Sequence, residues 1–211
     1  APSASHSSPM REAAYLFERF PSFGQTFCYR EVAELERQGT TVHVFSIRQP
    51  MDEPAENWDR SVVERVHYLP EEKALVAEID RVLKANAVSV GARTAVKEWG
   101  RQSDFLRLYQ AIYVGVRLQE KGVRRIHAHF AGMAARTAYW ISEFFGIPYS
   151  FTAHANDIFA PRDFVVSLAK LIGSAAAVVS VSDYAVRSLR ERFPESAAKI
   201  LRVYNGVDLA R

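Results

Sequence analysis

Short apolar and β-branched runs alternate with amphipathic segments along most of the chain. Strands are predicted where apolar and β-branched residues cluster: Glu12–Phe17, Thr41–Ile47, Arg65–Leu69, Arg125–Phe130, Tyr149–Ala153, Ala176–Val181 and Ile200–Tyr204. Helices are predicted where apolar residues recur every three or four positions: Phe27–Gln38, two or three helices within 71–121, Gly132–Phe145, Phe164–Gly173 and Asp183–Phe193. This order implies crossovers that cover both faces of a parallel sheet. We therefore expect a Rossmann-like, doubly wound α/β fold with a mainly parallel sheet of about seven strands.

Glycines mark the ends of two of the predicted helices. Gly39 follows the helix Phe27–Gln38 directly, in the position where a left-handed backbone ends many helices. The strongest amphipathic pattern runs over residues 105–116, with Ser103 placed to cap its start and Gly122 placed to end it.

The composition is that of an ordinary folded protein. Of the 211 residues, 48% are hydrophobic and 24% are charged, which is enough apolar surface for a core. The single cysteine, Cys28, excludes an intrachain disulfide and lies on the apolar face of a predicted helix, so we expect a packed thiol and a cytoplasmic protein. No apolar run approaches the ~20 residues of a membrane helix. Residues 1–9 lack periodicity and are expected to be a flexible leader, such as cloning leaves behind.

Positive charge is concentrated in one region. Residues 81–125 hold ten Lys or Arg and three acids, a net charge of +7, whereas the rest of the chain carries −4. Such a region suits phosphates or an anionic membrane surface, and the alternative is a solvated helix face. Nucleic acid is not expected as a partner, because the chain has no helix-turn-helix, zinc-finger or RNP-like pattern.

The loop after the first predicted strand carries a candidate anion site. Ligands of open parallel sheets bind at the carboxyl ends of the strands, where the strand order reverses. This loop lacks the GxGxxG fingerprint and the chain has no Walker A motif, so hydride transfer and ATP hydrolysis lose their main support. Gly24 nevertheless precedes a helix N-terminus, where backbone amides favour an anion. The alternative is a simple turn glycine.

Histidines end two of the predicted strands. His127 and His129 lie two residues apart on one strand and share a face, and His154 ends the next strand with Asp157 just beyond it. Two histidines with a third ligand from a neighbouring strand would suit a metal site with an open position. The alternative is polar residues that bind an organic ligand or their own neighbours, and we expect no metal.

Three runs of the sequence resemble one known family. The segments Tyr15–Arg48, Ile126–Phe159 and Ala175–Leu209, and above all the combination of FTAHANDIF with a late YNGVDL, resemble the N-terminal half of family 4 glycosyltransferases, which have the GT-B fold. The resemblance extends over nearly all of residues 10–209, and only the segment 71–121 carries no motif.

The resemblance implies one half of a two-domain enzyme. Residues 10–205 would be the acceptor-side Rossmann-like domain, and 206–211 would begin the crossover to a C-terminal domain that holds most of a nucleotide-sugar donor. Such enzymes transfer a sugar to an acceptor hydroxyl with retention of anomeric configuration, generally without a metal or other cofactor. The domain alone is therefore expected to be inactive or nearly so.

The resemblance also implies roles for particular residues. His154 would lie beside the donor sugar and the reacting centre, and Gly24 would face the donor diphosphate. Further donor-facing positions are Gln25, Ser182 and Asn205. The acceptor side would include His127, His129, Phe130, Asn156 and Asp157. The basic region 81–125 then becomes a candidate for an anionic or lipid-linked acceptor, or for peripheral contact with the inner face of a membrane.

Two other functions compete with sugar transfer. A non-catalytic module could keep the fold and work with a partner subunit that supplies the donor half. A metal-dependent hydrolase could use His127, His129 and His154 as ligands.

Overall fold

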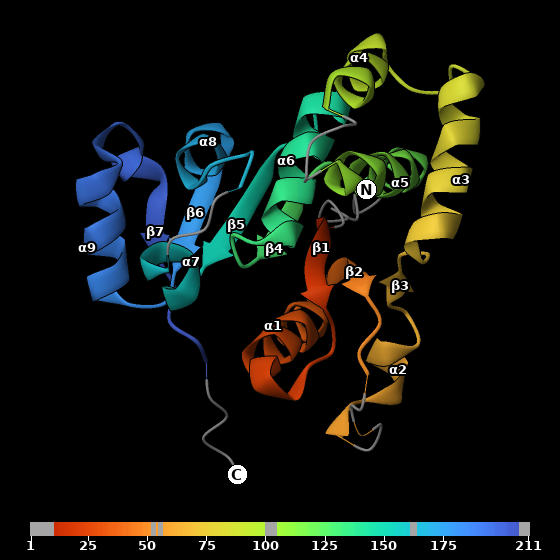
Figure 1. Cartoon of the computed structure of the whole chain (residues 1–211). Coiled ribbons are helices and arrows are strands. Elements are labelled where there is room, and N and C mark those ends of the chain that lie inside the picture. Colours follow the sequence, from red (N-terminus) through yellow and green to blue (C-terminus); the bar gives the residue numbers. More distant parts are fainter. Residues whose placement is uncertain (1–10, 52–53, 55–56, 100–104, 161–163, 207–211) are drawn as a thin grey trace, which may run out of the picture.

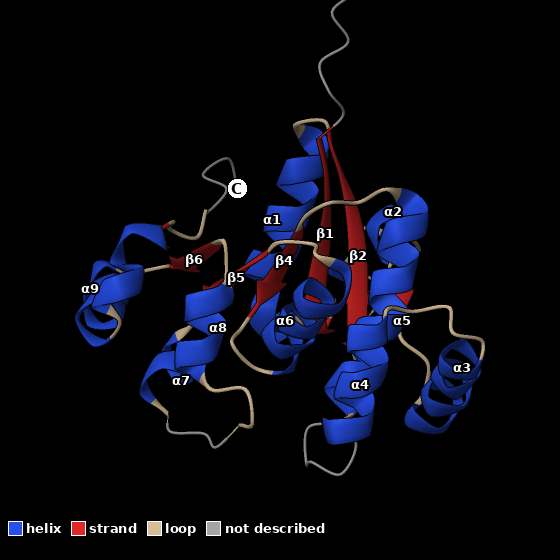
Figure 2. Cartoon of the chain, turned by 90° about the horizontal axis from the view of Figure 1, so that it is seen from above, coloured by secondary structure: helices blue, strands red, loops and turns tan. Residues whose placement is uncertain are grey.

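The fold is a parallel sheet with helices on both faces (Figures 1 and 2). The computed structural model describes residues 11–51, 54, 57–99, 105–160 and 164–206. Within these residues the sheet has seven strands in the order β3-β2-β1-β4-β5-β6-β7, and every neighbouring pair is parallel. The predicted doubly wound, Rossmann-like α/β fold is thus confirmed.

The strands are β1 (Arg11–Arg19), β2 (Thr40–Arg48), β3 (His67–Tyr68), β4 (Ile126–His129), β5 (Tyr149–Ala153), β6 (Ala177–Ser180) and β7 (Ile200–Arg202). The α-helices are α1 (Thr26–Arg37), α2 (Arg60–Val63), α3 (Glu72–Lys84), α4 (Val90–Trp99), α5 (Leu106–Lys121), α6 (Met133–Phe145), α7 (Ala155–Phe159), α8 (Leu168–Ser174) and α9 (Asp183–Arg192). Two 3₁₀ segments, Phe23–Gln25 and Pro194–Lys199, precede α1 and β7.

Alternation along β1 divides the core into two parts. Ala14 and Leu16 belong to the larger cluster, which includes α5, α6 and α8 side chains, whereas Tyr15 and Phe17 belong to a smaller cluster with Val32 of α1. Successive side chains of a strand point to opposite faces. Helix α1 therefore covers one face of the sheet at β1 and β2, and α5 and α6 cover the other (Figure 1).

The strand order reverses between β1 and β4. From β1 the chain proceeds outward through β2 to β3, and then returns to place β4 on the other side of β1, where Ala14 pairs with Ile126. The crevice outside the carboxyl ends of such a strand pair is where open α/β sheets bind ligands.

Most helix ends agree with the prediction. Gly39 follows α1 with a φ of 82°, and Gly122 ends α5 with a φ of 70°, both in the left-handed region that glycine enters at low cost. The segment 71–121 forms the helices α3, α4 and α5 and no strand among its described residues. Ser103, the predicted cap of α5, lies outside the described residues.

Some element boundaries differ from the prediction. The predicted helix Phe164–Gly173 begins instead at Leu168, because the Ser167 side chain accepts a hydrogen bond from the Lys170 N–H at 3.2 Å and so caps the helix there. The short helices α2 and α7 lie where loops were expected, since one-turn helices carry too little periodicity to be predicted. The last strand ends at Arg202 rather than Tyr204.

One face of the outer strands β6 and β7 is open. Val178 and Ile200 are fully buried in the larger core cluster, which includes side chains of α8 and α9, whereas Leu201 and Val203 are 44% and 56% exposed. Among the described residues, no helix is long and apolar enough to cross a membrane.

Candidate functional site

The candidate site lies at the carboxyl edge of the sheet, at the switch point between β1 and β4. The ring of Phe27, in the first turn of α1, lies 5.0 Å from the ring of His154, which follows β5. The ring of Phe130, which follows β4, lies 4.2 Å from the same imidazole. Three segments far apart in the sequence thus meet around His154.

Aromatic and imidazole rings form a stack beneath this edge. Phe17 of β1 and His129 of β4 stack with ring centroids 5.3 Å apart and an interplanar angle of 12°. The next ring is His154, whose centroid lies 5.9 Å from that of His129 at an angle of 25°. The sequence predicted that His129 and His154 belong to one site, and the structure brings them together.

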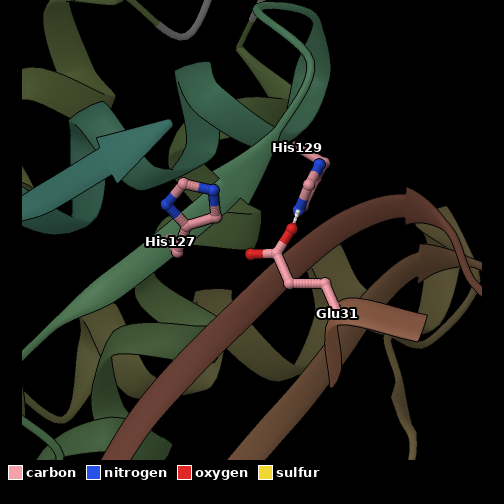
Figure 3. Close-up of side chains that lie close together, drawn as sticks. All are labelled: Glu31, His127 and His129. Carbon is pink, nitrogen blue, oxygen red and sulfur yellow. Dashed lines mark ion pairs between the residues drawn. The ribbon is translucent and has the colours of Figure 1, made fainter. Parts of the chain in front are cut away.

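Glu31 of α1 points toward the imidazole of His129, one ring of this stack (Figure 3). Its Oε2 atom lies 3.2 Å from Nε2 of the buried His129, and its Oε1 atom accepts a hydrogen bond from the Tyr15 hydroxyl at 2.7 Å. Burial alone would raise the pKa of Glu31, but pairing with His129, the nearby His127 and the bond from Tyr15 lower it to about 2. Glu31 is therefore ionised across the physiological pH range.

His127 is held by two hydroxyl groups. Its Nδ1 lies 2.8 Å from the Ser150 Oγ atom, and its Nε2 lies 2.9 Å from the Thr152 Oγ1 atom. Burial, together with the neighbouring His129, lowers the pKa of His127 to about 3. His127 is thus a neutral imidazole with both ring nitrogens engaged.

His154 has an unsatisfied ring nitrogen. Burial, followed by the charge of His129, lowers its pKa to about 4, so the ring is neutral near pH 7. Its buried Nε2 atom has no hydrogen-bond partner among the described residues. The main-chain N–H of His154 donates to the Asp157 carboxylate at 2.9 Å, which fixes the start of α7. A neutral imidazole with a free nitrogen can exchange a hydrogen bond with a bound ligand.

Phe130 adopts a strained backbone conformation at this edge. Its φ is 68°, which is uncommon for a residue with a bulky side chain, and its N–H donates to the Thr152 carbonyl at 2.9 Å. Such conformations persist where the surroundings hold them, often at binding sites. Here the strain places the Phe130 ring against His154.

The first loop leaves Gly24 open to solvent. Gly24 is exposed, its φ lies outside the positive range, and a Cβ atom placed on it would meet nothing within 4 Å. Neither the backbone nor the packing of the described residues therefore requires glycine here. Gly24 and Gln25 lie in the 3₁₀ turn just before α1, so they share the helix N-terminus with Phe27.

The remaining predicted residues occupy other positions along the same edge. The Ser182 hydroxyl caps α9 by accepting a hydrogen bond from the Ala185 N–H at 3.2 Å. Asn156 is exposed on α7, and Asn205 is exposed beyond β7.

A groove of about 870 Å³ runs beside the stack. Helix α1 forms one wall through Phe27 and Glu31, and Thr152, Val179 and Asn205 contribute to the opposite side. Glu31 and Thr152 bring the polar end of the groove next to His127. The groove is otherwise mostly apolar.

The side chains closest to a metal-like arrangement are not those expected. The carboxylate of Glu31, rather than His154 or Asp157, lies near the two β4 histidines, and the nearest polar atoms of Glu31, His127 and His129 all fall within 4.8 Å of one another. A metal would have to displace a hydroxyl from His127, and the Glu31 carboxylate already pairs with His129 and Tyr15.

Glu31 was missed by the sequence analysis, although a signal exists. It lies three residues after Cys28 and four before Leu35, so an acidic residue falls on the apolar face of α1. Cys28 itself is 1% exposed, which confirms the predicted packed thiol, and burial raises its pKa.

Comparisons with known proteins agree with this geometry. A family model described as "Glycosyltransferase Family 4" matches residues 24–211. No curated protein matches the chain significantly. Among solved structures, a glycosyltransferase from Rickettsia africae is similar with a TM-score of 0.57 at 15% identity, over 94% of this chain and 44% of the other.

Two further solved structures share the fold. A sucrose-phosphate synthase from Thermosynechococcus elongatus has a TM-score of 0.55 at 12% identity, over 95% of this chain and 49% of the other. A UDP-N-acetylglucosamine 2-epimerase from Rickettsia bellii has a TM-score of 0.55 at 11% identity, over 93% of this chain and 45% of the other. The chain thus spans less than half the length of these three proteins. Because one of them is named as an epimerase, the fold alone does not determine the reaction.

Proposed function

Because the chain belongs to glycosyltransferase family 4, we propose that it is the acceptor-side domain of an enzyme that transfers a sugar from a nucleotide-sugar donor to an acceptor hydroxyl with retention of configuration. The observation that carries the proposal is the meeting of the first loop, β4 and β5 around His154, whose buried Nε2 has no partner among the described residues.

The residues of this edge suit the difficult step of such a reaction. Departure of a nucleoside diphosphate needs dipoles near its phosphates, and the amides at the start of α1, beside the open Gly24, can supply them. Neutral His154 would donate a hydrogen bond to the sugar or orient it, while Phe130 and Phe27 keep water from its ring. No step of this scheme requires a metal.

A second domain would complete the site. The Rickettsia africae glycosyltransferase is matched over 44% of its length, and the GT-B fold places a donor-binding domain across the cleft from this one. Ser182 and Asn205, on the side where α9 begins and β7 ends, would face that domain. The chain without this partner would turn over donor at a negligible rate.

The basic region would serve the acceptor. Arg81, Lys84, Lys121, Arg124 and Arg125 are exposed and would attract an anionic or lipid-linked acceptor, or the inner face of an anionic membrane, in a cytoplasmic protein. Arg107 cannot contribute, because it is only 6% exposed, and Arg117 pairs with Glu78 at 3.0 Å.

Sugar transfer can be tested with the chain joined to the remainder of its reading frame. Release of nucleoside diphosphate from UDP-, GDP- and ADP-sugars would be measured for the wild type and for His154→Ala, with His67→Ala on the exposed β3 as the control. We expect His154→Ala to lower the rate by about tenfold or more and to leave the circular dichroism unchanged. An unchanged rate would remove His154 from the site, and a protein that binds these donors without releasing product would be a non-catalytic module.

A further inference from the structure

Glu31 is an acidic side chain placed at the edge of a ring cluster. It belongs to the apolar face of α1, and its side chain is 39% exposed toward the groove while its carboxylate reaches the buried His129. Moving a carboxylate out of water is costly unless the charge is paired and hydrogen-bonded. A neutral side chain of similar shape would avoid this cost, so the charge calls for a physical explanation.

Both oxygens of this carboxylate are committed to different partners. Oε1 accepts from the Tyr15 hydroxyl of β1. Oε2 faces Nε2 of His129 on β4 (Figure 3). The two partners lie on neighbouring strands of the sheet, so they fix the carboxylate in position from two sides.

Glu31 is the polar anchor of the His129 ring. Both ring nitrogens of His129 are buried. Among the described residues Nδ1 has no hydrogen-bond partner, and the polar neighbour of Nε2 is the Glu31 carboxylate, which lies 3.2 Å away without hydrogen-bond geometry. The ring stacks with those of Phe17 and His154. Stacking limits the tilt of the ring, and the pairing with Glu31 sets its rotation within the stack.

We propose that Glu31 is a positioning residue, whose carboxylate fixes the imidazole of His129 and, through the ring stack, the plane of the His154 imidazole. The proposal rests on the proposed sugar transfer for its functional meaning, since that transfer depends on His154. Glu31 itself does not touch the reacting atoms.

Loss of the carboxylate would also change the charge that His154 faces. The groups around His154 are His129 from β4, Glu31 from α1 and Asp157 from α7. Glu31→Gln removes a negative charge that raises the pKa of His154, so that pKa should decrease.

The test follows the His154 ring by NMR in the isotopically labelled chain, without any donor. Glu31→Gln keeps the shape of the side chain and removes its charge. Glu34→Gln is the matched control, because it removes an exposed carboxylate one turn further along α1, where it pairs with Arg37. His154→Gln assigns the resonances of the His154 ring.

We expect Glu31→Gln to weaken the NOEs between the His129 and His154 rings and to shift the His154 ring protons. The pKa of His154 should fall further below its usual range, because the carboxylate whose charge raises it is gone. Glu34→Gln should match the wild type. Ring contacts and titration in Glu31→Gln that superimpose on those of Glu34→Gln would overturn the proposal.

Two further measurements keep the proposal falsifiable. If Glu31→Gln does not fold, Glu31→Asp replaces it, because aspartate retracts the carboxylate by one methylene. Glu31→Asp should weaken the same ring contacts to a smaller extent. Ring contacts in Glu31→Asp that match those of the wild type would refute the positioning role of Glu31. One equivalent of Zn²⁺ should leave the His127 and His129 resonances unchanged, and stoichiometric binding would assign Glu31 to a metal instead. Because no donor is present, failure here leaves the proposed transfer intact.

Discussion

The ring of Phe145 occupies the space that a Cβ atom on Gly115 would need. Gly115 lies inside α5 and is buried, and Phe145 ends α6, so the contact fixes how closely these two helices approach. A glycine in a helix interior costs about 1 kcal/mol relative to alanine, and here the cost is offset by close packing.

Gly115→Ala should therefore destabilise the protein. Displacement of Phe145 should lower the free energy of unfolding by about 1–2 kcal/mol, more than the gain in helix propensity. Urea denaturation would measure the change. Gly91→Ala in α4 is the control, because its Cβ would meet only the Ser89 hydroxyl at 3.9 Å and should be neutral or stabilising. In a Phe145→Ala background the cost of Gly115→Ala should disappear, and a persisting cost would contradict this account.

Ser46 of β2 holds the segment after β1 in place through hydrogen bonds. Its buried hydroxyl accepts from the Phe20 N–H at 3.0 Å and donates to the Arg48 carbonyl at 2.7 Å. Ser46→Ala leaves a buried N–H without that partner, so we expect a loss of about 2 kcal/mol in thermal or urea unfolding. Exposed Ser61→Ala should change stability by no more than about 0.5 kcal/mol. Equal effects of the two substitutions would disprove the role of Ser46.

Arg136 of α6 holds the segment that leads into α8. Its Nε donates to the Val166 carbonyl at 2.9 Å, its Nη1 donates to the Ala131 carbonyl, and its guanidinium lies over the Phe164 ring. The single ammonium group of lysine cannot make the same set of hydrogen bonds as the guanidinium, so Arg136→Lys should lower the free energy of unfolding by about 2 kcal/mol. Amide hydrogen exchange at residues 164–167 should accelerate. Arg187→Lys on the exposed side of α9 should leave that exchange unchanged. Exchange in Arg136→Lys as slow as in the wild type would show that Arg136 does not hold this segment.

Acid should destabilise the domain below about pH 6.5. The pKa of His127 is about 3 in the folded state against 6.5 in the unfolded chain, so the unfolded state binds more protons between these values and stability falls as pH falls. His127→Gln removes this titrating ring. It should therefore reduce the slope of the free energy of unfolding against pH by about 1.4 kcal/mol per pH unit between about pH 6 and pH 4. His154 and Glu31, whose pKa values are also lowered, act in the same direction.

The control for this pH dependence is His67→Gln. His67 is exposed on β3 and should change the slope less, although burial of part of its ring lowers its pKa as well. A slope that is the same in His127→Gln and the wild type would show that His127 takes up its proton in the folded state.

The sequence predicted the inner strands of the sheet well because they are buried on both faces. The range Tyr149–Ala153 matches β5 at both ends, since β5 lies inside the sheet and its apolar residues are bounded by Pro148 and His154. At the edge of the sheet the prediction was less accurate. Only His67–Tyr68 of the predicted Arg65–Leu69 pairs with β2, because the preceding residues continue from α2.

The candidate site was predicted in part. Spacing on β4 places His127 and His129 on one face, and chain order brings His154 to the neighbouring strand end. The contribution of Glu31 depends on how α1 packs across β1 and β4, a tertiary relationship that local periodicity does not contain. The left-handed backbone of Phe130 was likewise not predictable, because a bulky residue rarely adopts it.

The open face of β6 and β7 has a practical consequence for solution work on this chain. Leu201 and Val203 present aliphatic surface to water beside a largely apolar groove of about 870 Å³. A fluorescent dye of the anilinonaphthalene sulfonate type, commonly used to diagnose partly folded states, should therefore bind the fully native domain. Dye fluorescence would then report this exposed apolar surface rather than loss of structure. Detergents or apolar substrate analogues would compete with the dye for the same surface.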